Sequence, residues 1–220
     1  MKNSQAYWRQ IDILNKRDIN NIDVGIIGAG GVGSPLALLL AKMGVDNLEV
    51  WDFDKVEIHN LPNQLFRMSD IGKKKVEALK EIVKDFSEED IKVVDKKWDG
   101  KMKSILIVAV DSMDTRIDIW NKVKEHEGEV DLFIETRMGA ELMRIYAIDP
   151  LSLNQAEFYE STLYSSSEAK ELQCTERAIF YNVFMISSFV GAIVKHHLKN
   201  EKYPKELVYN LKDFSYMKTN

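Results

Sequence analysis

The sequence predicts an α/β fold with a mostly parallel sheet, helices on both faces and some antiparallel strands toward the C-terminus. Between residues 24 and 126, short apolar runs alternate with longer segments of helical periodicity, a pattern typical of parallel strands joined by helices. These apolar runs are continuous, as expected for strands buried on both faces. After residue 128, two runs follow each other with no helical segment between them. We therefore expect antiparallel pairing there.

The first half of the chain has clear element boundaries. A helix is expected within residues 1–18, and the run VGIIG at 24–28 is expected to be the first buried strand. The next helix should span Ser34 to Met43, because Pro35 suits a first helical turn and Gly44 suits a helix end. The elements expected after it are a strand at 47–52, a helix at 73–86, a strand at 104–111 and a helix at 112–126.

The second half is less regular. Strands are expected at 129–139 and 141–149, a polar loop crossing the molecule at 151–174, a helix at 175–198 and one or two strands within 206–217. The long helix carries small residues at three- and four-residue spacing, which would let another backbone approach closely, either in the core or in a dimer. No Pro/Gly/Ser-rich linker divides the chain, so we expect one Rossmann-like domain over residues 1–220.

Composition narrows the class of protein. The 220 residues are 45% hydrophobic and carry a formal net charge of -5, which argues against nucleic acid as the primary partner. The longest apolar run, at 178–194, is shorter than the roughly 20 residues that cross a bilayer, so we expect no membrane span. The single cysteine, Cys174, cannot form an internal disulfide, and the polar N-terminal residues lack the apolar core of a signal peptide. We therefore expect the protein in a reducing cytoplasm.

A glycine-rich turn follows the first expected strand. The segment GAGGVG contains Gly28, Gly30, Gly31 and Gly33, and such a turn lets a phosphate approach the backbone at a helix N-terminus. Asp52 ends the next strand, near the position where dinucleotide-binding folds keep an acid for a ribose hydroxyl. On these residues alone NAD and ATP fit equally well, and a purely structural turn stays possible.

A longer pattern makes the interpretation more specific. It consists of Arg9, Gln10, Gly28 through Ser34, Asp52, Asp54, Val56, Asn60, Leu61, Gln64, Gly72, Lys75, Val76, Glu77, Asp111 and Arg116. The order and spacing of these residues resemble the family of ATP-dependent adenylyltransferases that includes ThiF, MoeB, HesA and the adenylating domain of ubiquitin-activating enzymes. The resemblance covers residues 7–116 and favours ATP, because an NAD site does not require the residues after Asp54.

The resemblance implies a reaction and roles for the matching residues. Such enzymes activate a carboxylate, usually the C-terminal glycine of a small ubiquitin-like or sulfur-carrier protein, by attack on the α-phosphate of ATP. By resemblance, Lys75 is the cation at the reacting phosphate, Asp111 is the Mg²⁺ ligand, and Arg9 reaches the ATP of a partner subunit in a homodimer. The positions expected to bind the nucleotide are Gly28, Gly30, Gly31, Gly33, Asp52, Asp54, Asn60, Asn63, Lys75 and Ser112.

The chain departs from the family pattern at two places. Asn63 stands where the pattern has an arginine, so a neutral amide replaces a guanidinium that would neutralise phosphate charge. Either another cation takes over this duty, with Arg67, Lys73 and Lys74 as the nearby candidates, or catalysis is weaker. The paired C-x-x-C motifs that hold structural zinc in several relatives are missing from the sequence, so no zinc is expected.

Cys174 allows two interpretations. It follows the polar loop and precedes the long helix, where the helix dipole would favour a thiolate, so it is a possible acyl acceptor. A lone cysteine can equally be a small apolar side chain packed under a helix.

Two other functions stay open. An NAD-dependent oxidoreductase would account for the glycines and Asp52, but not for Lys75 or Asp111. A non-catalytic nucleotide-binding module of the same fold would be consistent with Asn63. The acceptor of an adenylating enzyme could be a ubiquitin-like or sulfur-carrier protein, a short peptide or a small carboxylic acid.

Overall fold

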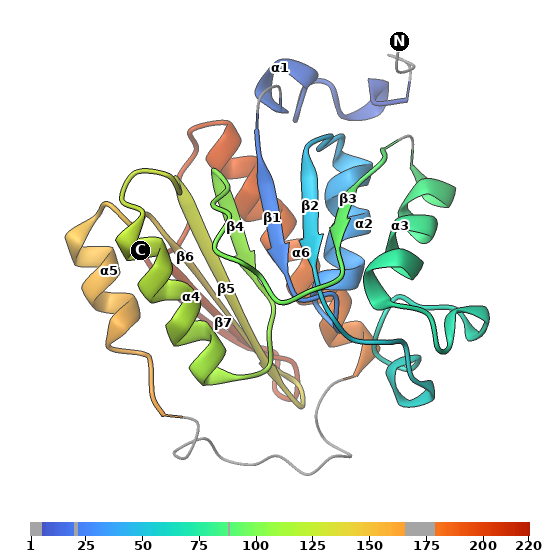
Figure 1. The fold of residues 1–220 in the computed structure, drawn as a ribbon. Coiled ribbons are helices and arrows are strands. Elements are labelled where there is room, and N and C mark those ends of the chain that lie inside the picture. The colour runs from blue at the N-terminus through green and yellow to red at the C-terminus, as the bar shows by residue number, and fades with distance from the viewer. Residues whose placement is uncertain (1–5, 20–21, 88, 166–178) are drawn as a thin grey trace.

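In residues 6–19, 22–87, 89–165 and 179–220, which the computed structural model describes, the chain forms an eight-stranded mixed sheet flanked by helices (Figure 1). The strands are β1 Val24–Ile27, β2 Leu48–Trp51, β3 Lys92–Val94, β4 Ile105–Val108, β5 Leu132–Gly139, β6 Leu142–Ile148, β7 Glu206–Asn210 and β8 Ser215–Thr219. The helices are α1 Lys16–Ile19, α2 Gly33–Met43, α3 Lys75–Phe86, α4 Met113–Glu125, α5 Leu153–Glu160 and α6 Phe180–Leu198.

Five strands form the parallel part of the sheet. The strand order is β3-β2-β1-β4-β5-β6-β7-β8, and β1 pairs in parallel with both β2 and β4. The chain therefore runs outward from β1 through β2 to β3 and then returns to β4 on the other side of β1. This reversal creates a topological switch point, where a crevice opens at the carboxyl ends of the strands.

The C-terminal half of the sheet is antiparallel, as the sequence predicts. The pairs β5 with β6, β6 with β7, and β7 with β8 are all antiparallel. The turn between β5 and β6 includes Ala140, which has a positive φ of 51°. The expected fold class is thus confirmed in both its parallel and its antiparallel parts.

Two apolar cores, one on each face of the sheet, hold the helices. One core joins the sheet to α2, α3 and α6, and it includes Leu36, Leu79 and Val190. The other joins the opposite face to α4 and α5, and it includes Trp120 and Tyr159. All five side chains are fully buried. Helices therefore cover both faces of the sheet and pack against it from two sides.

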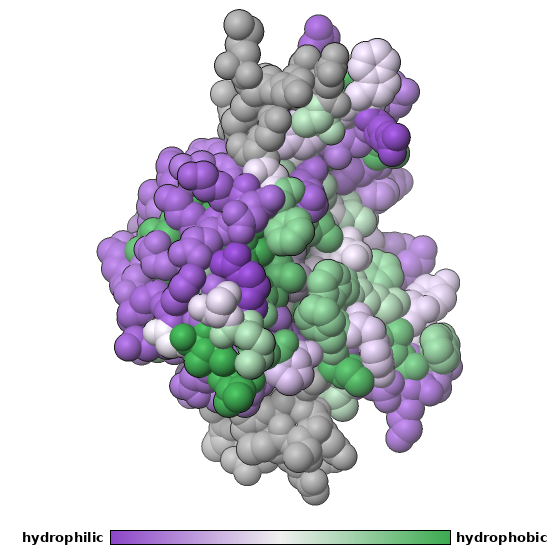
Figure 2. Space-filling model, turned by 90° about the vertical axis from the view of Figure 1, so that its right-hand side faces the viewer, coloured by the Kyte–Doolittle hydropathy of each residue, from purple (hydrophilic) through white to green (hydrophobic). Residues whose placement is uncertain are grey.

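Helix α3 has the amphipathic pattern expected from the sequence. Val76, Leu79 and Val83 are buried against the sheet, whereas Glu77 and Glu81 are exposed. Figure 2 views the molecule from the side of α3 and β3, where hydrophilic side chains cover one part of the surface and hydrophobic ones gather beside them. A helix with one apolar stripe positions itself on the sheet by burying that stripe.

Two local expectations were wrong, and one strand was not predicted. In the described part of residues 1–18, a short 3-10 helix at Trp8–Gln10 and the four-residue helix α1 replace the single helix that was expected. The expected loop at 151–174 begins with helix α5, whose only buried residue is Tyr159. Strand β3 was not predicted; it has three residues, of which the first is exposed and the other two are half-buried. Short or weakly amphipathic elements carry little periodic signal.

Of the small residues of α6, Ser187 and Gly191 are buried in the core, whereas Ser188 and Ala192 are exposed. Helix α6 packs against α2, and a Cβ added to Gly191 would lie 2.4 Å from Cδ2 of Leu39. Ser187 is buried and donates its hydroxyl to the backbone oxygen of Val183 at 2.8 Å. At Gly191, close packing within one chain explains the small side chain. No helix in the described ranges is both long and apolar enough to cross a membrane.

Candidate functional site

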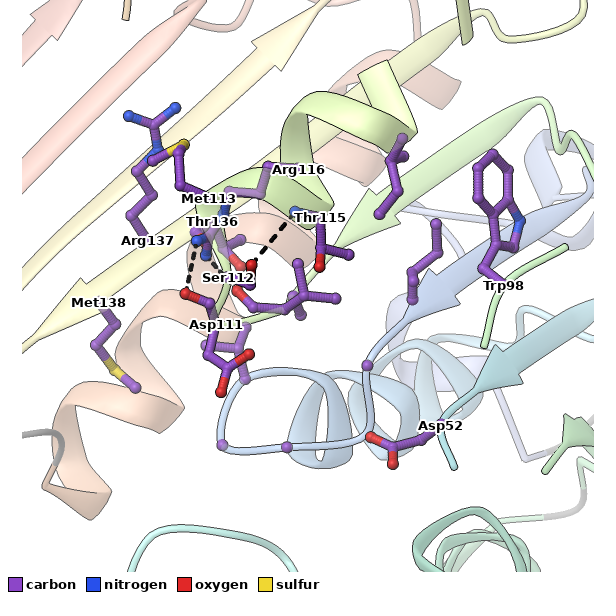
Figure 3. A pocket seen from close by; sticks show the side chains of 18 of the residues that line it. Asp52, Trp98, Asp111, Ser112, Met113, Thr115, Arg116, Thr136, Arg137 and Met138 are labelled. Carbon is purple, nitrogen blue, oxygen red and sulfur yellow. Dashed lines mark hydrogen bonds between the residues drawn. The ribbon is translucent and has the colours of Figure 1, made fainter. Parts of the chain in front are cut away.

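An open cleft of ≈ 1770 Å³ lies at the carboxyl ends of the parallel strands (Figure 3). Segments far apart in the sequence line it: the glycine turn, the end of β2, the start of α3, the segment between β4 and α4, and β5. Pockets for small molecules are typically roughly 300–1,000 Å³. The cleft is therefore large enough for a nucleotide together with part of a second reactant.

The glycines of the turn serve different purposes. Gly28 has a φ of +99°, and a Cβ added to Gly33 would lie 1.8 Å from the backbone oxygen of Gly28, so the fold itself requires glycine at both positions. A Cβ added to Gly30 would meet no protein atom within 4 Å. Gly30 therefore leaves open space that a ligand can use to approach the backbone at the N-terminus of α2.

Asp52 ties the end of β2 to this turn. One carboxylate oxygen accepts a hydrogen bond from the Ala29 amide at 2.7 Å, and the other accepts one from the Asp54 amide at 2.8 Å. Each oxygen keeps a second lone pair for a further donor. Asp52 lines the cleft, so its position suits the ribose contact expected from the sequence, and that role stays a prediction.

Lys75 lies at the first residue of α3 and reaches into the cleft. Its side chain is 9% exposed, and Nζ donates to Oδ2 of Asp54 at 2.8 Å. The backbone holds the same pair, because the Lys75 amide donates to the Asp54 carbonyl at 3.0 Å. Lys75 is thus a fixed, buried cation in the cleft wall, not one of several solvated lysines.

Asp111 follows β4, and its carboxylate points toward the glycine turn (Figure 3). Within the described residues this carboxylate accepts no hydrogen bond and makes no ion pair, whereas the next residue, Ser112, caps α4 by accepting from the Thr115 amide at 3.3 Å. The described residues contain no cluster of three metal-ligating side chains. Because Mg²⁺ beside phosphates needs only one or two protein carboxylates, Asp111 fits this metal.

A smaller side cavity of ≈ 330 Å³ adjoins the cleft. Its lining is Asp54, Lys55, Glu57, His59, Asn60, Asn63, Gln64, Lys75 and Asp111. Asn60 is buried, and its side-chain oxygen accepts from the Glu57 amide at 2.9 Å. The side-chain oxygens of Asn63 and Gln64 are shielded from solvent and have no hydrogen-bond partner in the part of the chain that is described. These amides remain available to a ligand.

The three cations expected to compensate for Asn63 are engaged elsewhere. Arg67 donates to Asp70, Glu81 and Asp85. Lys73 pairs with Asp70 and Glu81, and Lys74 lies 3.1 Å from Asp95. The carboxylates of Asp70 and Asp85 raise the pKa of Arg67, and those of Glu81 and Asp70 raise the pKa of Lys73. Since none of the three lines either cavity, the expectation is wrong.

Two candidates remain. Arg9 lies away from the cleft, and Cys174 lies outside the described residues. Gln10, next to Arg9, donates to the Met43 carbonyl at 2.7 Å, which places Arg9 at the end of α2 opposite to the glycine turn. Arg9 is exposed there, so it does not join the cleft of its own chain, and its contact with a partner subunit stays a prediction.

Arg137 lines the cleft from β5 and was not predicted from the sequence. Its guanidinium carbon lies 4.6 Å from the ring centre of Tyr146, and Nε donates to Glu135 at 2.7 Å. Glu135 is fully buried and also accepts from Arg116 at 2.7 Å. Two charged residues spaced by two in an apolar strand share one face of the sheet. That spacing was the signal for a buried ionic cluster.

Comparison with known sequences gives a family match over almost the whole chain. A sequence model described as the ThiF family matches residues 2–216. Ubiquitin-like modifier-activating enzyme 5 of Caenorhabditis elegans is 28% identical over 127 residues, covering 57% of this chain and 28% of that protein. The adenylyltransferase and sulfurtransferase MOCS3-1 of Zea mays is 36% identical over 84 residues, covering 38% of this chain and 18% of that protein. The chain thus matches less than a third of the length of either relative.

Solved structures share the fold. PaaA has a TM-score of 0.76 and 17% identity, covering 98% of this chain and 72% of that one. Escherichia coli MccB, solved with AMPCPP and MccA, has a TM-score of 0.75 and 16% identity, covering 100% of this chain and 72% of that one. At this level of identity the likeness shows a common architecture.

Proposed function

This chain belongs to the ThiF family, and we propose that it uses ATP and Mg²⁺ to adenylate a carboxylate. The acceptor in this proposal is the C-terminus of a small ubiquitin-like or sulfur-carrier protein, or of a peptide. One observation carries it: the folded chain brings Gly30, Asp52, Lys75 and Asp111 into one cleft. An NAD site would not explain the buried Lys75 in the cleft or Asp111, whose carboxylate has no partner among the described residues.

The reaction is mainly a problem of charge. A carboxylate oxygen would form a bond to the α-phosphorus of ATP while the bond from that phosphorus to the β-bridging oxygen breaks, releasing pyrophosphate. Both reactants are anions, so the site must place positive charge and N–H dipoles where negative charge gathers. Mg²⁺, when bound, would neutralise phosphate oxygens.

The residues of this chain would divide that work. Asp111 would hold the metal ion, and Lys75 would meet the reacting phosphate. Nζ of Lys75 lies 2.8 Å from Oδ2 of Asp54, so the lysine side chain is oriented before the nucleotide binds. The reaction then requires little further ordering of this side chain. The open space at Gly30 would let the phosphates approach the N–H groups at the N-terminus of α2.

The relatives support the class of acceptor. Two of them are named for activation of a ubiquitin-like modifier and for adenylyl and sulfur transfer, and MccB was solved with MccA. The cleft also extends along β5 and β6 past Met138 and Leu142 to Arg144. This extension suits a chain terminus better than a compact metabolite.

The function is tested by ATP–pyrophosphate exchange. The purified protein is incubated with ATP, Mg²⁺ and labelled pyrophosphate, together with a ubiquitin-like protein ending in Gly-Gly, a Gly-Gly-ended peptide, or no acceptor. Exchange that depends on an acceptor supports adenylation. Titration with NAD⁺ and NADH runs in parallel. Binding of a nicotinamide cofactor in preference to ATP would overturn the proposal, and ATP binding with no exchange would indicate a non-catalytic module.

Replacing Gly30 with alanine should weaken ATP binding and leave stability unchanged. The added methyl group meets no protein atom within 4 Å, but it would intrude on a ligand at the turn. Overpacking of this kind costs about 1–3 kcal/mol, which is roughly a 5- to 150-fold loss of affinity. Calorimetric titration and thermal melting measure the two effects.

Gly33→Ala provides the contrast. There the methyl group would meet the Gly28 carbonyl at 1.8 Å, so the melting temperature itself should fall. A Gly30→Ala protein with wild-type affinity for ATP would show that the nucleotide does not contact the turn.

A further inference from the structure

The side cavity holds three carboxylates beside the expected phosphate site. Asp54, Glu57 and Asp111 line it, against two lysines, Lys55 and Lys75, and one histidine. A triphosphate would add further negative charge. Unless a metal ion and at least one uncommitted cation face the phosphates, repulsion at close range would oppose binding.

Two of the three basic groups are committed. Nζ of Lys75 lies 2.8 Å from Asp54. Nδ1 of His59 lies 3.2 Å from Oε2 of Glu57, and the His59 side chain is 72% exposed. Each therefore has an acidic neighbour that offsets its charge when it is protonated.

Lys55 is the uncommitted cation of the cavity. Across the described ranges its ammonium group makes no hydrogen bond or ion pair, and it lies on the cavity wall. Its backbone is nevertheless well anchored, because Lys55 forms an antiparallel bridge with Lys74. Flanking hydrogen bonds at 2.9 and 3.0 Å hold both sides of that bridge. An anchored backbone with a free side chain positions a flexible point charge beside the cavity.

The segment at Asn63 and Gln64 contributes no charge to the cavity. The backbone oxygen of Asn63 lies 3.3 Å from the position of a Cβ on Gly31, so this segment runs along the glycine turn. The side chains presented there, Asn63 and Gln64, are neutral amides with unpartnered oxygens in the described structure. A rotated amide can donate a hydrogen bond to a phosphate, but it cannot neutralise one.

We propose that Lys55 binds the terminal phosphates of ATP and supplies the positive charge that the Asn63 segment lacks. The inference rests on the proposed function, since it assigns a residue to the triphosphate of the same site. It predicts selectivity for ATP over AMP, because AMP lacks the two phosphates that Lys55 would contact. It also predicts that an arginine at position 63 of the same cavity can replace Lys55.

The test compares the affinities for Mg-ATP and AMP by calorimetric titration. Loss of a charge-assisted contact of about 1.5–3 kcal/mol corresponds to a loss of roughly 10- to 150-fold. Lys55→Ala should therefore bind Mg-ATP at least about tenfold more weakly while its affinity for AMP stays unchanged. Lys55→Arg should retain the preference for ATP, and the double variant Lys55→Ala/Asn63→Arg should regain it.

Lys74→Ala is the matched control, because Lys74 is bridged to Lys55 but its ammonium group pairs with Asp95 at 3.1 Å. Its ATP-to-AMP affinity ratio should equal that of the wild type. If Lys55→Ala also keeps the wild-type ratio, the inference is overturned and the proposed function stands. If the wild-type protein does not bind ATP, the proposed function and the inference are overturned together.

Discussion

Asp111→Ala is expected to lower acceptor-dependent ATP–pyrophosphate exchange at least about a hundredfold while the protein stays folded. Loss of one electrostatic group at a reacting centre typically costs 10²–10³ in rate, and this carboxylate is our proposed metal ligand. The side chain is exposed and has no hydrogen-bond or ion-pair partner among the described residues, so its removal breaks no contact of the fold. Exchange assays and thermal melting on the same preparations measure both quantities.

The matched control for this variant is Glu125→Ala. Glu125 is an exposed acid at the other end of α4, so its removal changes net charge equally without touching the cleft. Exchange should stay at the wild-type level. Wild-type exchange in the Asp111→Ala protein would remove Asp111 from the mechanism.

Glu135→Ala is expected to destabilise the fold by about 3–5 kcal/mol, the usual cost of leaving a buried charge unpaired. Glu135 is fully buried and accepts hydrogen bonds from Arg116 and Arg137, each at 2.7 Å. Burial lowers the pKa of Arg137, but the charge and hydrogen bond of Glu135, together with Tyr146 and Tyr159, outweigh this effect and the pKa is raised overall. Burial, followed by the same carboxylate, raises the pKa of the Tyr159 phenol. Equilibrium unfolding in urea measures the loss.

Asp118→Ala tests the contrast between buried and surface charge. Asp118 lies on α4 as Arg116 does, but it pairs with Lys122 at 3.5 Å and its side chain is 67% exposed. An exposed pair of this kind contributes about 0.3–0.5 kcal/mol, so the change in unfolding free energy should be small. A loss below about 1 kcal/mol for Glu135→Ala would mean that the two arginines find other partners or water.

The sequence predicts much of the fold because the main signals are local. Continuous apolar runs mark β1, β2 and β4, and the apolar stripe of α3 marks its buried face. Pro35 and Gly44 bound α2, where Gly44 takes a φ of 96° as a helix end requires. By contrast, α5 buries only Tyr159 and β3 has three residues, so neither has enough periodicity to be detected.

The candidate site, like the fold, was only partly predictable from the sequence. Asp52, Lys75 and Asp111 are predicted from their spacing along a family pattern, and the fold brings them to one cleft. Arg67 and Lys73 are near the cleft in sequence but bind carboxylates on their own side of the molecule. Which nearby cation is available to a ligand depends on the carboxylates it pairs with, and a sequence motif does not show these pairs.

The sequence by itself thus determined the order of the longer helices and of the strands with clear apolar runs, the glycine turn and the family, because each follows from local sterics, periodicity or spacing. Only the tertiary structure decided which charges are available to a ligand. Lys75 is oriented by Asp54, Arg116 and Arg137 both pair with Glu135, and Lys55 has no partner among the described residues. The physical reason is that ion pairing depends on distances of a few ångströms between side chains from different elements, and the three-dimensional fold sets those distances.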